Sequence, residues 1–244
     1  MSQKSSGGLG ETIRTVIYAV LIAVAVRTFA FEPFSIPSGS MIPTLLVGDY
    51  LFVSKYSYGY SRYSFPFGLG MFSGRILGSE PERGDVVVFK KPTDNATDYI
   101  KRIVGLPGDQ IQVRSSILYI NGEAMPRERV DDLEDPGGGS RKMQQYRETL
   151  PNGVSYLVLD RGPNEYLDNT LVYTVPPGHY FVMGDNRDNS ADSRVLGDVG
   201  YVPKDNLIGR AELLFYSTDG TADWWEFWQW PSATRYGRLF QAVR

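Results

Sequence analysis

The sequence predicts a mainly β protein in which one N-terminal transmembrane helix precedes an all-β domain that carries an inserted β subdomain. Three observations predict this class: an apolar segment near the N-terminus, short runs of β-branched and aromatic residues between turn signals, and a charged stretch that interrupts those runs. At 244 residues the chain is long enough to bury a substantial core. The expected parts are an N-terminus at 1–11, an anchor at 12–31, a β domain at 35–114 and 174–216, an insert at 115–173 and an aromatic tail at 217–244.

Residues 12–31 are typical of a membrane anchor, because the stretch from Val16 to Val26 contains no charge. A full span needs about 20 mostly apolar residues, so the segment is short and Arg27 would have to extend its guanidinium to the interface. Lys4 and Arg14 precede the uncharged stretch, which favours a cytoplasmic N-terminus. A cleaved secretory signal and the buried helix of a soluble protein remain alternatives.

Nine runs beyond residue 35 are predicted to be strands, since each is rich in β-branched or aromatic residues and is bounded by turn signals. Gly-Asp precedes such a run three times, and Asn121-Gly122 is typical of a hairpin turn. The predicted strands are Tyr50–Ser54, Asp85–Phe89, Tyr99–Val104, Gln110–Val113, Ile117–Ile120, Val154–Leu159, Leu171–Val175, Tyr180–Met183 and Leu207–Tyr216.

Two stretches break the strand pattern. Gly59–Gly78 is rich in glycine and aromatic residues, and Asn121–Asp168 is highly charged and includes Gly137-Gly138-Gly139. We expect the second stretch to be an inserted, partly flexible and solvated subdomain without chemistry of its own.

The composition excludes several classes of function. Lys and Arg total 25 against 28 for Asp and Glu, so the net charge is −3 and no basic excess is available for binding nucleic acid. Cysteine is absent, which excludes disulfides, thiol catalysis and Cys-ligated zinc. The single histidine, His179, leaves little scope for a His-based metal site, and any Ser-His-Asp triad would have to use it. No metal or cofactor is expected.

Two segments contain residues that suit nucleophilic catalysis. In Pro37–Asp49, Ser40 lies in a tight Ser-Gly-Ser turn, although a serine in such a loop is more often only a turn residue. In Asp98–Asp109, Lys101 and Arg102 are adjacent cations within an apolar strand pattern, where side chains alternate between the two faces. A desolvated lysine loses its proton well below its usual pKa of about 10.4 and can then act as a general base. The alternative is a pair of edge-strand cations whose charged ends reach water.

The third segment, Gly184–Asp198, is dense in carboxylates, amides and hydroxyls. An EF-hand calcium loop does not fit, because the sixth and twelfth positions counted from Asp188 are Ser193 and Val199 instead of Gly and Glu. We expect instead a network that positions other groups. Its candidate members are Asp185, Asp192, Arg194 and, as a hydroxyl, Ser190.

Together these three segments resemble the bacterial type I signal peptidases, or leader peptidases. PSGSMIPTL, YIKRIVGLPGD and GDNRDNSADSR match the characteristic boxes of that family in the family's order, and the anchor and the strand RGDVVVFK match as well. The resemblance covers roughly residues 12–114 and 174–216, whereas the insert and the tail match loosely. It implies an all-β catalytic domain of the signal-peptidase type and a membrane-bound serine endopeptidase that removes signal peptides from exported preproteins with a Ser-Lys dyad.

The resemblance also implies a role for each candidate residue. Ser40 would be the nucleophile and Lys101 the general base, and the Ser40 backbone N–H and the Ser38 hydroxyl would form the oxyanion hole. Ser190 would orient the Lys101 amine. The supporting ion pairs would be Asp192–Arg194 and Asp185–Arg102, and the small apolar substrate pockets would be lined by Ile36, Leu45, Tyr99 and Ile100. The expected substrate has small residues at the first and third positions before the cleaved bond.

The expected partners are preprotein signal peptides and the lipid bilayer, without nucleic acid, and the chain is expected to be a monomer. It is expected in the bacterial inner (cytoplasmic) membrane as a single-pass protein with its catalytic domain on the periplasmic, extracytoplasmic side. The single membrane segment departs from family members that have two. Two alternatives remain: a conjugation- or pilus-type peptidase of the same superfamily, and a catalytically silent, membrane-tethered homologue that only binds peptides. The anchor argues against a soluble self-cleaving repressor with the same Ser-Lys chemistry.

All four tryptophans lie in the tail, within Trp224–Trp230. Tryptophan favours the headgroup region of a bilayer because its ring is apolar and its N–H is polar. The tail is therefore a candidate for a second contact with the membrane. The alternative is that these rings pack onto the core of the β domain.

Overall fold

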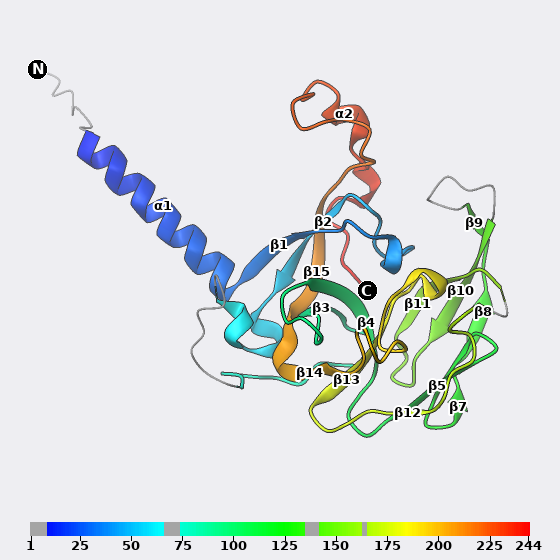
Figure 1. Cartoon of the computed structure of the whole chain (residues 1–244). Coiled ribbons are helices and arrows are strands. Elements are labelled where there is room, and N and C mark those ends of the chain that lie inside the picture. Colours follow the sequence, from blue (N-terminus) through cyan, green and yellow to red (C-terminus); the bar gives the residue numbers. More distant parts are fainter. Residues whose placement is uncertain (1–8, 66–73, 135–141, 163–164) are drawn as a thin grey trace, which may run out of the picture.

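The computed structural model describes residues 9–65, 74–134, 142–162 and 165–244. As predicted, the protein is mainly β: one long N-terminal helix projects away from a body whose described strands form three antiparallel sheets (Figure 1). The run Gly137-Gly138-Gly139 and the middle of the Gly59–Gly78 stretch, both singled out in the sequence, lie outside the described residues.

The helix α1 (Leu9–Phe29) is long and apolar enough to cross a membrane, and its apolar side chains are exposed. At about 1.5 Å per residue it is about 31 Å long, which matches the hydrocarbon core of a bilayer. The helix begins and ends a little earlier than the expected 12–31, because Phe31 already belongs to the first strand. Phe29 packs edge-to-face on Tyr60 and Phe65 and so joins the helix to the β domain.

The largest sheet has the strand order β1-β2-β15-β3-β4-β13-β14, and its neighbouring strands are antiparallel. Side chains alternate across its central strands: in β3, Val86 and Val88 enter one buried apolar cluster, and Val87 and Phe89 enter another on the opposite face. Both faces are therefore covered, and polar groups on the central strands are removed from water. The strands are β1 (Phe31–Ser35), β2 (Asp49–Ser54), β3 (Val86–Lys90), β4 (Asp98–Gly105), β13 (His179–Met183), β14 (Val202–Pro203) and β15 (Leu207–Ser217).

Two smaller sheets contain the inserted segment, one with the order β12-β5-β6-β7 and one with the order β11-β10-β8, where β9 also pairs with β10. A third apolar cluster joins them to the large sheet, since it contains Val104 and Phe181 together with Ile111 and Val158. Because β5 pairs with β6 in a hairpin, the inserted sheets begin before the expected residue 115. The strands are β5 (Gln110–Arg114), β6 (Ile117–Ile120), β7 (Glu123–Ala124), β8 (Arg127–Arg129), β9 (Leu133–Glu134), β10 (Lys142–Thr149), β11 (Ser155–Asp160) and β12 (Tyr173–Thr174).

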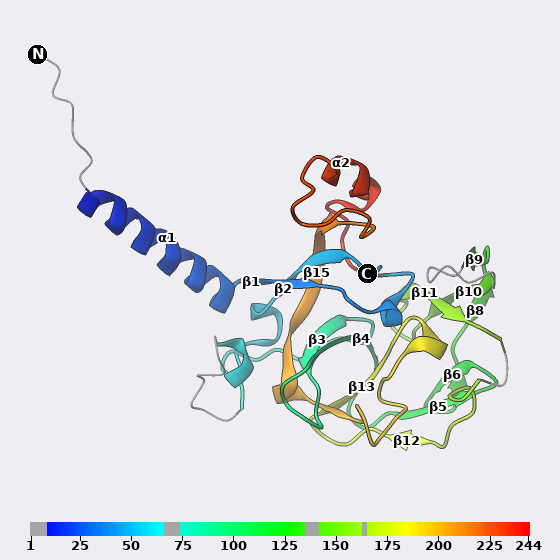
Figure 2. The same ribbon diagram turned by 45° about the horizontal axis from the view of Figure 1, so that its top comes forward.

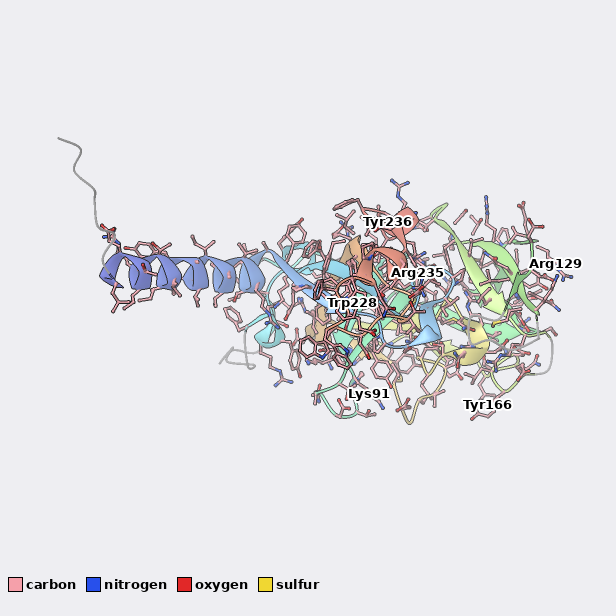
Figure 3. The ribbon with its side chains drawn as sticks, turned by 90° about the horizontal axis from the view of Figure 1, so that it is seen from above. Lys91, Arg129, Tyr166, Trp228, Arg235 and Tyr236 are labelled. Atoms are coloured by element: carbon pink, nitrogen blue, oxygen red, sulfur yellow. The ribbon has the colours of Figure 1, made fainter. Side chains whose placement is uncertain are left out.

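After β15 the chain forms a projection, here called the aromatic lobe (residues 218–234), which includes the short helix α2 (Trp230–Ala233) and stands out from the large sheet (Figures 1 and 2). Its base is held by a bridge between Thr218 and Thr234. Its aromatic side chains are exposed, from 46% for Trp230 to 79% for Trp224, and several of them contact one another. Trp228 lies on this lobe, which faces the viewer in Figure 3. The alternative that these rings pack onto the core is therefore wrong.

Candidate active site

Three segments that are far apart in the sequence meet beside β4. Ser40 lies in a single 3-10 turn (Gly39–Met41) after β1, Lys101 lies in β4, and the 184–194 loop follows β13. Asn186 joins the first segment to the third, because its backbone N–H donates to Ser40 O (3.1 Å) and its Nδ2 donates to Gly39 O (3.0 Å). Since β4 and β13 are neighbours, the loop emerges next to Lys101.

Ser40 is held in a closely packed turn and is only 6% exposed. Its backbone N–H donates to Ser38 Oγ (3.3 Å), which caps the turn. Gly184 approaches it so closely that a Cβ at this position would lie 2.5 Å from Ser40 O and 2.2 Å from Ser190 Oγ. Only glycine allows this approach, so a larger residue at position 184 would push the 184–194 loop away from the serine turn.

Lys101 Nζ lies 2.7 Å from Ser40 Oγ and 2.9 Å from the carbonyl oxygen of the preceding residue. The side chain is 3% exposed, and the ring of Tyr99 lies 5.3 Å from Nζ on the same face of the strand. Burial lowers the pKa of Lys101 to about 8, while Asp192 and Asp185 favour the charged form and limit the shift. The amine can therefore lose its proton near neutral pH, as a general base requires. The edge-strand alternative required the charged end of Lys101 to reach water, whereas the structure buries it.

Arg102 follows Lys101 and faces the other side of β4, where it is completely buried. Its Nε and Nη2 donate to the two carboxylate oxygens of Asp185 at 2.9 and 2.7 Å, and its Nη1 donates to Gly84 O at 2.8 Å. Burial opposes the charge of Arg102, but Asp185 outweighs burial and raises the pKa of the guanidinium. The cation beside the candidate base is thus fully paired on the opposite face of the strand.

Asp192 and Arg194 form a second buried pair. Arg194 Nε and Nη2 lie 2.8 and 2.9 Å from the two carboxylate oxygens of Asp192, which also accepts from the Gly184 N–H at 3.0 Å. Burial alone would raise the pKa of Asp192, but Arg194 and the hydrogen bonds outweigh burial and hold that pKa below its usual range. Asp192 is therefore ionised and contributes negative charge close to Lys101.

The hydroxyls of Ser38 and Ser190 lie near Ser40 without a hydrogen bond to Lys101. Ser38 Oγ lies 3.2 Å from Ser40 Oγ and accepts from the Ser40 N–H, so the two groups expected to form the oxyanion hole face each other. Ser190 is buried against Gly184 and close to Asp192, whereas Lys101 Nζ donates to other partners. The expected roles of Ser38 and Ser190 stay predictions.

Three of the four residues expected to line the substrate pockets share one apolar cluster: Ile36 and Leu45 are buried in it, and Ile100 packs against it. Tyr99 belongs to the opposite face of β4, where it packs against Phe89. The structure separates Tyr99 from the other three because neighbouring residues of a strand point to opposite faces.

Several polar residues that support the site were missed in the sequence. Thr44 donates to Asp185 Oδ2 at 2.6 Å, and Asn186 bonds to the serine turn as described above. Both residues lie inside the matched boxes, where a hydroxyl and an amide could have been recognised as candidate hydrogen-bonding groups of the site. Glu148 lies in the insert, where nothing distinguished it from other acidic residues, yet its carboxylate is buried against Arg187.

His179 begins β13, and its Nδ1 lies 2.9 Å from Pro177 O. It forms no hydrogen bond to Ser40 or Lys101, whose own partners are given above. In the described parts of the chain, no group of three or more His, Cys, Asp or Glu residues could hold a metal ion. The candidate nucleophile and the candidate base that the structure brings together are thus a serine and a lysine.

Comparison with known proteins identifies the family to which the chain belongs. The family model described as signal peptidase, peptidase S26, matches residues 9–216. Signal peptidase I of Rickettsia typhi is 39% identical over 98% of this chain and 95% of that protein, and signal peptidase I of Rickettsia canadensis is 41% identical over 93% and 91%. The crystal structure of a signal peptidase I from Enterococcus faecalis V583 is 28% identical, covers 54% of this chain and 97% of that chain, and has a TM-score of 0.34. Because the family match runs from the anchor through all three boxes, the chain belongs to the signal peptidase family, peptidase S26.

Proposed function

We propose that the signal peptidase activity of this chain, the removal of signal peptides from preproteins, is carried out by Ser40 as the nucleophile and Lys101 as the general base. The observation that carries the proposal is the 2.7 Å contact between Lys101 Nζ and Ser40 Oγ, with both side chains almost completely buried. A neutral amine at this position can accept the hydroxyl proton. Among the described residues, Lys101 is the titratable side chain that is hydrogen-bonded to Ser40 Oγ.

The reaction begins when Ser40 Oγ gives its proton to Lys101 Nζ and attacks the carbonyl carbon of the scissile bond. The carbonyl oxygen becomes an oxyanion that accepts from the Ser40 N–H and the Ser38 hydroxyl. Because Ser38 Oγ accepts from that N–H in the free protein, the Ser38 side chain has to turn toward the oxyanion. Lys101 then protonates the amine of the mature protein as the C–N bond breaks. Water, deprotonated by Lys101, hydrolyses the acyl-enzyme and releases the signal peptide.

Small side chains suit the space beside Ser40. Ile36 and Leu45 are 4% and 0% exposed and belong to a closely packed apolar cluster. A large residue next to the cleaved bond would have to displace this packing, and a charged residue would lose its hydration. We therefore expect small residues at the first and third positions before the cleaved bond of the preprotein.

The short link between the anchor and Ser40 would hold Ser40 close to the membrane. Ser40 follows the last residue of α1, Phe29, by eleven residues, which span at most about 40 Å when fully extended. Arg27 pairs with Glu32 at 2.8 Å, whereas Arg14 lies in the first half of α1 and favours a cytoplasmic N-terminus. We expect α1 to span the bacterial inner membrane with the catalytic domain on the extracytoplasmic side, where the apolar part of the preprotein's signal peptide also ends.

The aromatic lobe is proposed as a second contact with the bilayer. Its tryptophan rings are exposed, and the lobe and the free end of α1 project from the same side of the β domain in Figures 1 and 2. Rings with an apolar face and a polar N–H are most stable in the headgroup region. The bilayer would thus hold the catalytic domain at both the anchor and the lobe.

Incubation of the purified full chain, in detergent or vesicles, with a preprotein tests the proposed function. The wild-type protein is expected to cleave one bond, which is located by sequencing the new amino terminus. Ser40→Ala should abolish the cleavage because Oγ forms the acyl-enzyme. Ser155→Ala, which changes an exposed serine of β11, is the matched control and should cleave normally. Cleavage that persists in Ser40→Ala would reject the nucleophile.

A further inference from the structure

Glu148 has no part in the dyad reaction, yet its carboxylate is completely buried in β10 and pairs with Arg187 of the 184–194 loop. Arg187 donates to both of its oxygens, with the longer bond at 3.1 Å, and the Tyr156 hydroxyl donates to Oε1 at 2.6 Å. Arg187 and Tyr156 are each only 4% exposed. Burial alone would raise the pKa of Glu148, but Arg187, Tyr156 and the more distant Arg127 outweigh burial and keep it ionised.

Arg187 connects Glu148 to the serine turn. It directly follows Asn186, whose N–H groups donate to Ser40 O and Gly39 O. Arg187 also begins the 3-10 turn Arg187–Asn189, and its carbonyl oxygen accepts from Arg194 Nη2 at 2.5 Å. The ion pair with Glu148 therefore fixes the point where the 184–194 loop contacts the nucleophile.

Tyr156 connects Glu148 to the strand that carries the base. The guanidinium carbon of Arg102 lies 4.1 Å from the centre of the Tyr156 ring, a cation–π contact. Arg102 directly follows Lys101 in β4. Because Glu148 accepts from the Tyr156 hydroxyl, it also holds the ring beneath Arg102. Tyr156 lies in β11, and this strand also contacts the 184–194 loop directly: the Leu159 N–H donates to Asp185 O at 2.8 Å.

Six buried charged side chains pair with one another near the dyad, and their charges cancel. The cations are Arg102, Arg187 and Arg194, and the anions are Asp185, Asp192 and Glu148. Without the charge of Glu148, Arg187 would compete with Arg102 for Asp185, which already favours the charged form of Arg187. The groups that face Lys101 itself are Asp185, Asp192 and the Tyr99 ring. If Asp185 interacted more strongly with Arg187, it would stabilise the Lys101 ammonium less.

We propose that Glu148 is a positioning residue of the cleavage reaction, which fixes the 184–194 loop against the Ser40 turn through Arg187 and completes the charge balance beside Lys101. The proposal rests on the Ser40–Lys101 dyad. It gives the inserted sheet, expected from the sequence to be without chemistry, a direct effect on the catalytic groups.

Glu148→Gln in the full chain tests the proposal, because it preserves the shape of the side chain and removes its charge. We expect kcat to fall by about 10- to 100-fold, the cost of a small displacement of reacting groups, with KM within about twofold. In the pH profile of kcat/KM, the acid limb is the range in which activity falls as the pH decreases. This limb should move to lower pH, because the unpaired Arg187 disfavours the Lys101 ammonium. Glu148→Asp keeps the charge and should return the acid limb to its wild-type position while it recovers part of kcat.

Asp160→Asn is the matched control. It breaks the Arg127–Asp160 pair (2.5 Å) in the same sheet but leaves the charge of Arg127, so Glu148 stays ionised. The Asp160 carboxylate accepts from Arg127 and Gly162, not from the 184–194 loop. Both variants should lower Tm, but only Glu148→Gln should change kcat and the acid limb. An unchanged kcat per folded molecule together with an unmoved limb in Glu148→Gln would overturn the proposal.

If Glu148→Gln does not fold, Tyr156→Phe decides the question, since it removes only the hydroxyl that donates to Glu148. A lower kcat at unchanged KM supports the positioning role, and an unchanged kcat overturns it. The dyad itself is tested separately in the wild-type background. A wild-type acid limb that vanishes in His179→Gln would reject the Lys101 base, whatever the Glu148 variants do.

Discussion

The surroundings of Lys101 and the aromatic lobe depart in opposite directions from the usual distribution of side chains. Around Lys101, six charged side chains that pair with one another are at most 4% exposed. In the aromatic lobe, tryptophan and phenylalanine side chains are at least 46% exposed. Folding alone favours neither arrangement, because burying charge costs free energy and exposing aromatic rings forgoes hydrophobic stabilisation.

The two regions differ in where the compensation comes from. The buried charges are compensated inside the protein, by bidentate ion pairs such as Arg102–Asp185 and Arg194–Asp192. The rings of the lobe contact mainly each other, as Trp224 does with Trp225 and Phe227 with Trp228. We infer that the first region is complete in the isolated chain, whereas the second is completed by the bilayer.

The largest effect is expected from Lys101→Met, which replaces the base with an apolar side chain of similar length and buries no new charge. Without a group that accepts the Ser40 proton, kcat/KM should fall by about 10⁴-fold or more. The rate of preprotein cleavage, quantified by gel electrophoresis, measures the loss.

His179→Gln is the control for Lys101→Met, because His179 is the one histidine of the chain. It bonds only within its own turn, to Pro177 O, and the variant should keep most of the activity. The reverse pattern, with loss in His179→Gln and retention in Lys101→Met, would reject the dyad.

Ser38→Ala is expected to have the next largest effect. Loss of one oxyanion donor typically lowers kcat by about 10²–10³-fold, and KM should change little because the donor acts on charge that develops in the transition state. Steady-state kinetics with a preprotein or a signal-peptide substrate separate the two parameters. A change in KM alone would mean that Ser38 binds substrate instead of stabilising the oxyanion.

Most strands could be predicted from the sequence because their burial demands β-branched and aromatic residues. In β3, for example, Val86, Val87, Val88 and Phe89 are all buried between two clusters. β10 could not be predicted in this way, because most residues of Lys142–Thr149 are polar. Only Met143 and Glu148 of this strand are buried. β1 contains Pro33, which is tolerated because the strand lies at the edge of the sheet.

The candidate site was predictable only as far as its residues lie in contiguous motifs. Ser40, Lys101 and the pair Asp185–Arg102 come from the three boxes, and the structure brings these residues together. Glu148 could not be found, because its burial depends on Arg187, which is 39 residues away in the chain. Tyr99 was expected among the substrate pockets, although strand alternation places it on the face opposite to Ile100.

The pH dependence of kcat/KM is expected to report the Lys101 ammonium. Burial lowers the pKa of Lys101 to about 8, and in the proposed mechanism only the neutral amine can accept the Ser40 proton. Below about pH 8, kcat/KM should therefore fall about tenfold per pH unit, and above it a plateau should be reached. The limb should keep its position in His179→Gln. A limb that disappears in this variant would assign the base to the histidine.

The smallest effect on catalysis is expected from changes in the aromatic lobe, yet the lobe offers a direct measurement on the unaltered chain. All four tryptophans of the chain lie within Trp224–Trp230, so intrinsic tryptophan fluorescence reports on the lobe alone. If the rings occupy the headgroup region, emission of the full chain should be quenched in vesicles of brominated phospholipid, relative to the unbrominated lipid. Strong quenching by a water-soluble quencher in both vesicles, with no effect of bromine, would place the lobe in water.

Replacing Trp225 and Trp228 by Ser then separates membrane contact from folding. Because these two rings are 53% and 62% exposed, the double variant should lose little stability and Tm should change by less than about 2 °C. Cleavage of a short soluble peptide should be unchanged, since the Trp225 and Trp228 rings are exposed and the dyad has its own buried network. Emission from the remaining Trp224 and Trp230 should become less sensitive to brominated lipid, because two of the rings that anchor the lobe are gone. A sharp fall in Tm with unaltered quenching would show that the lobe serves the fold and not the membrane, and would remove the contrast between the two regions.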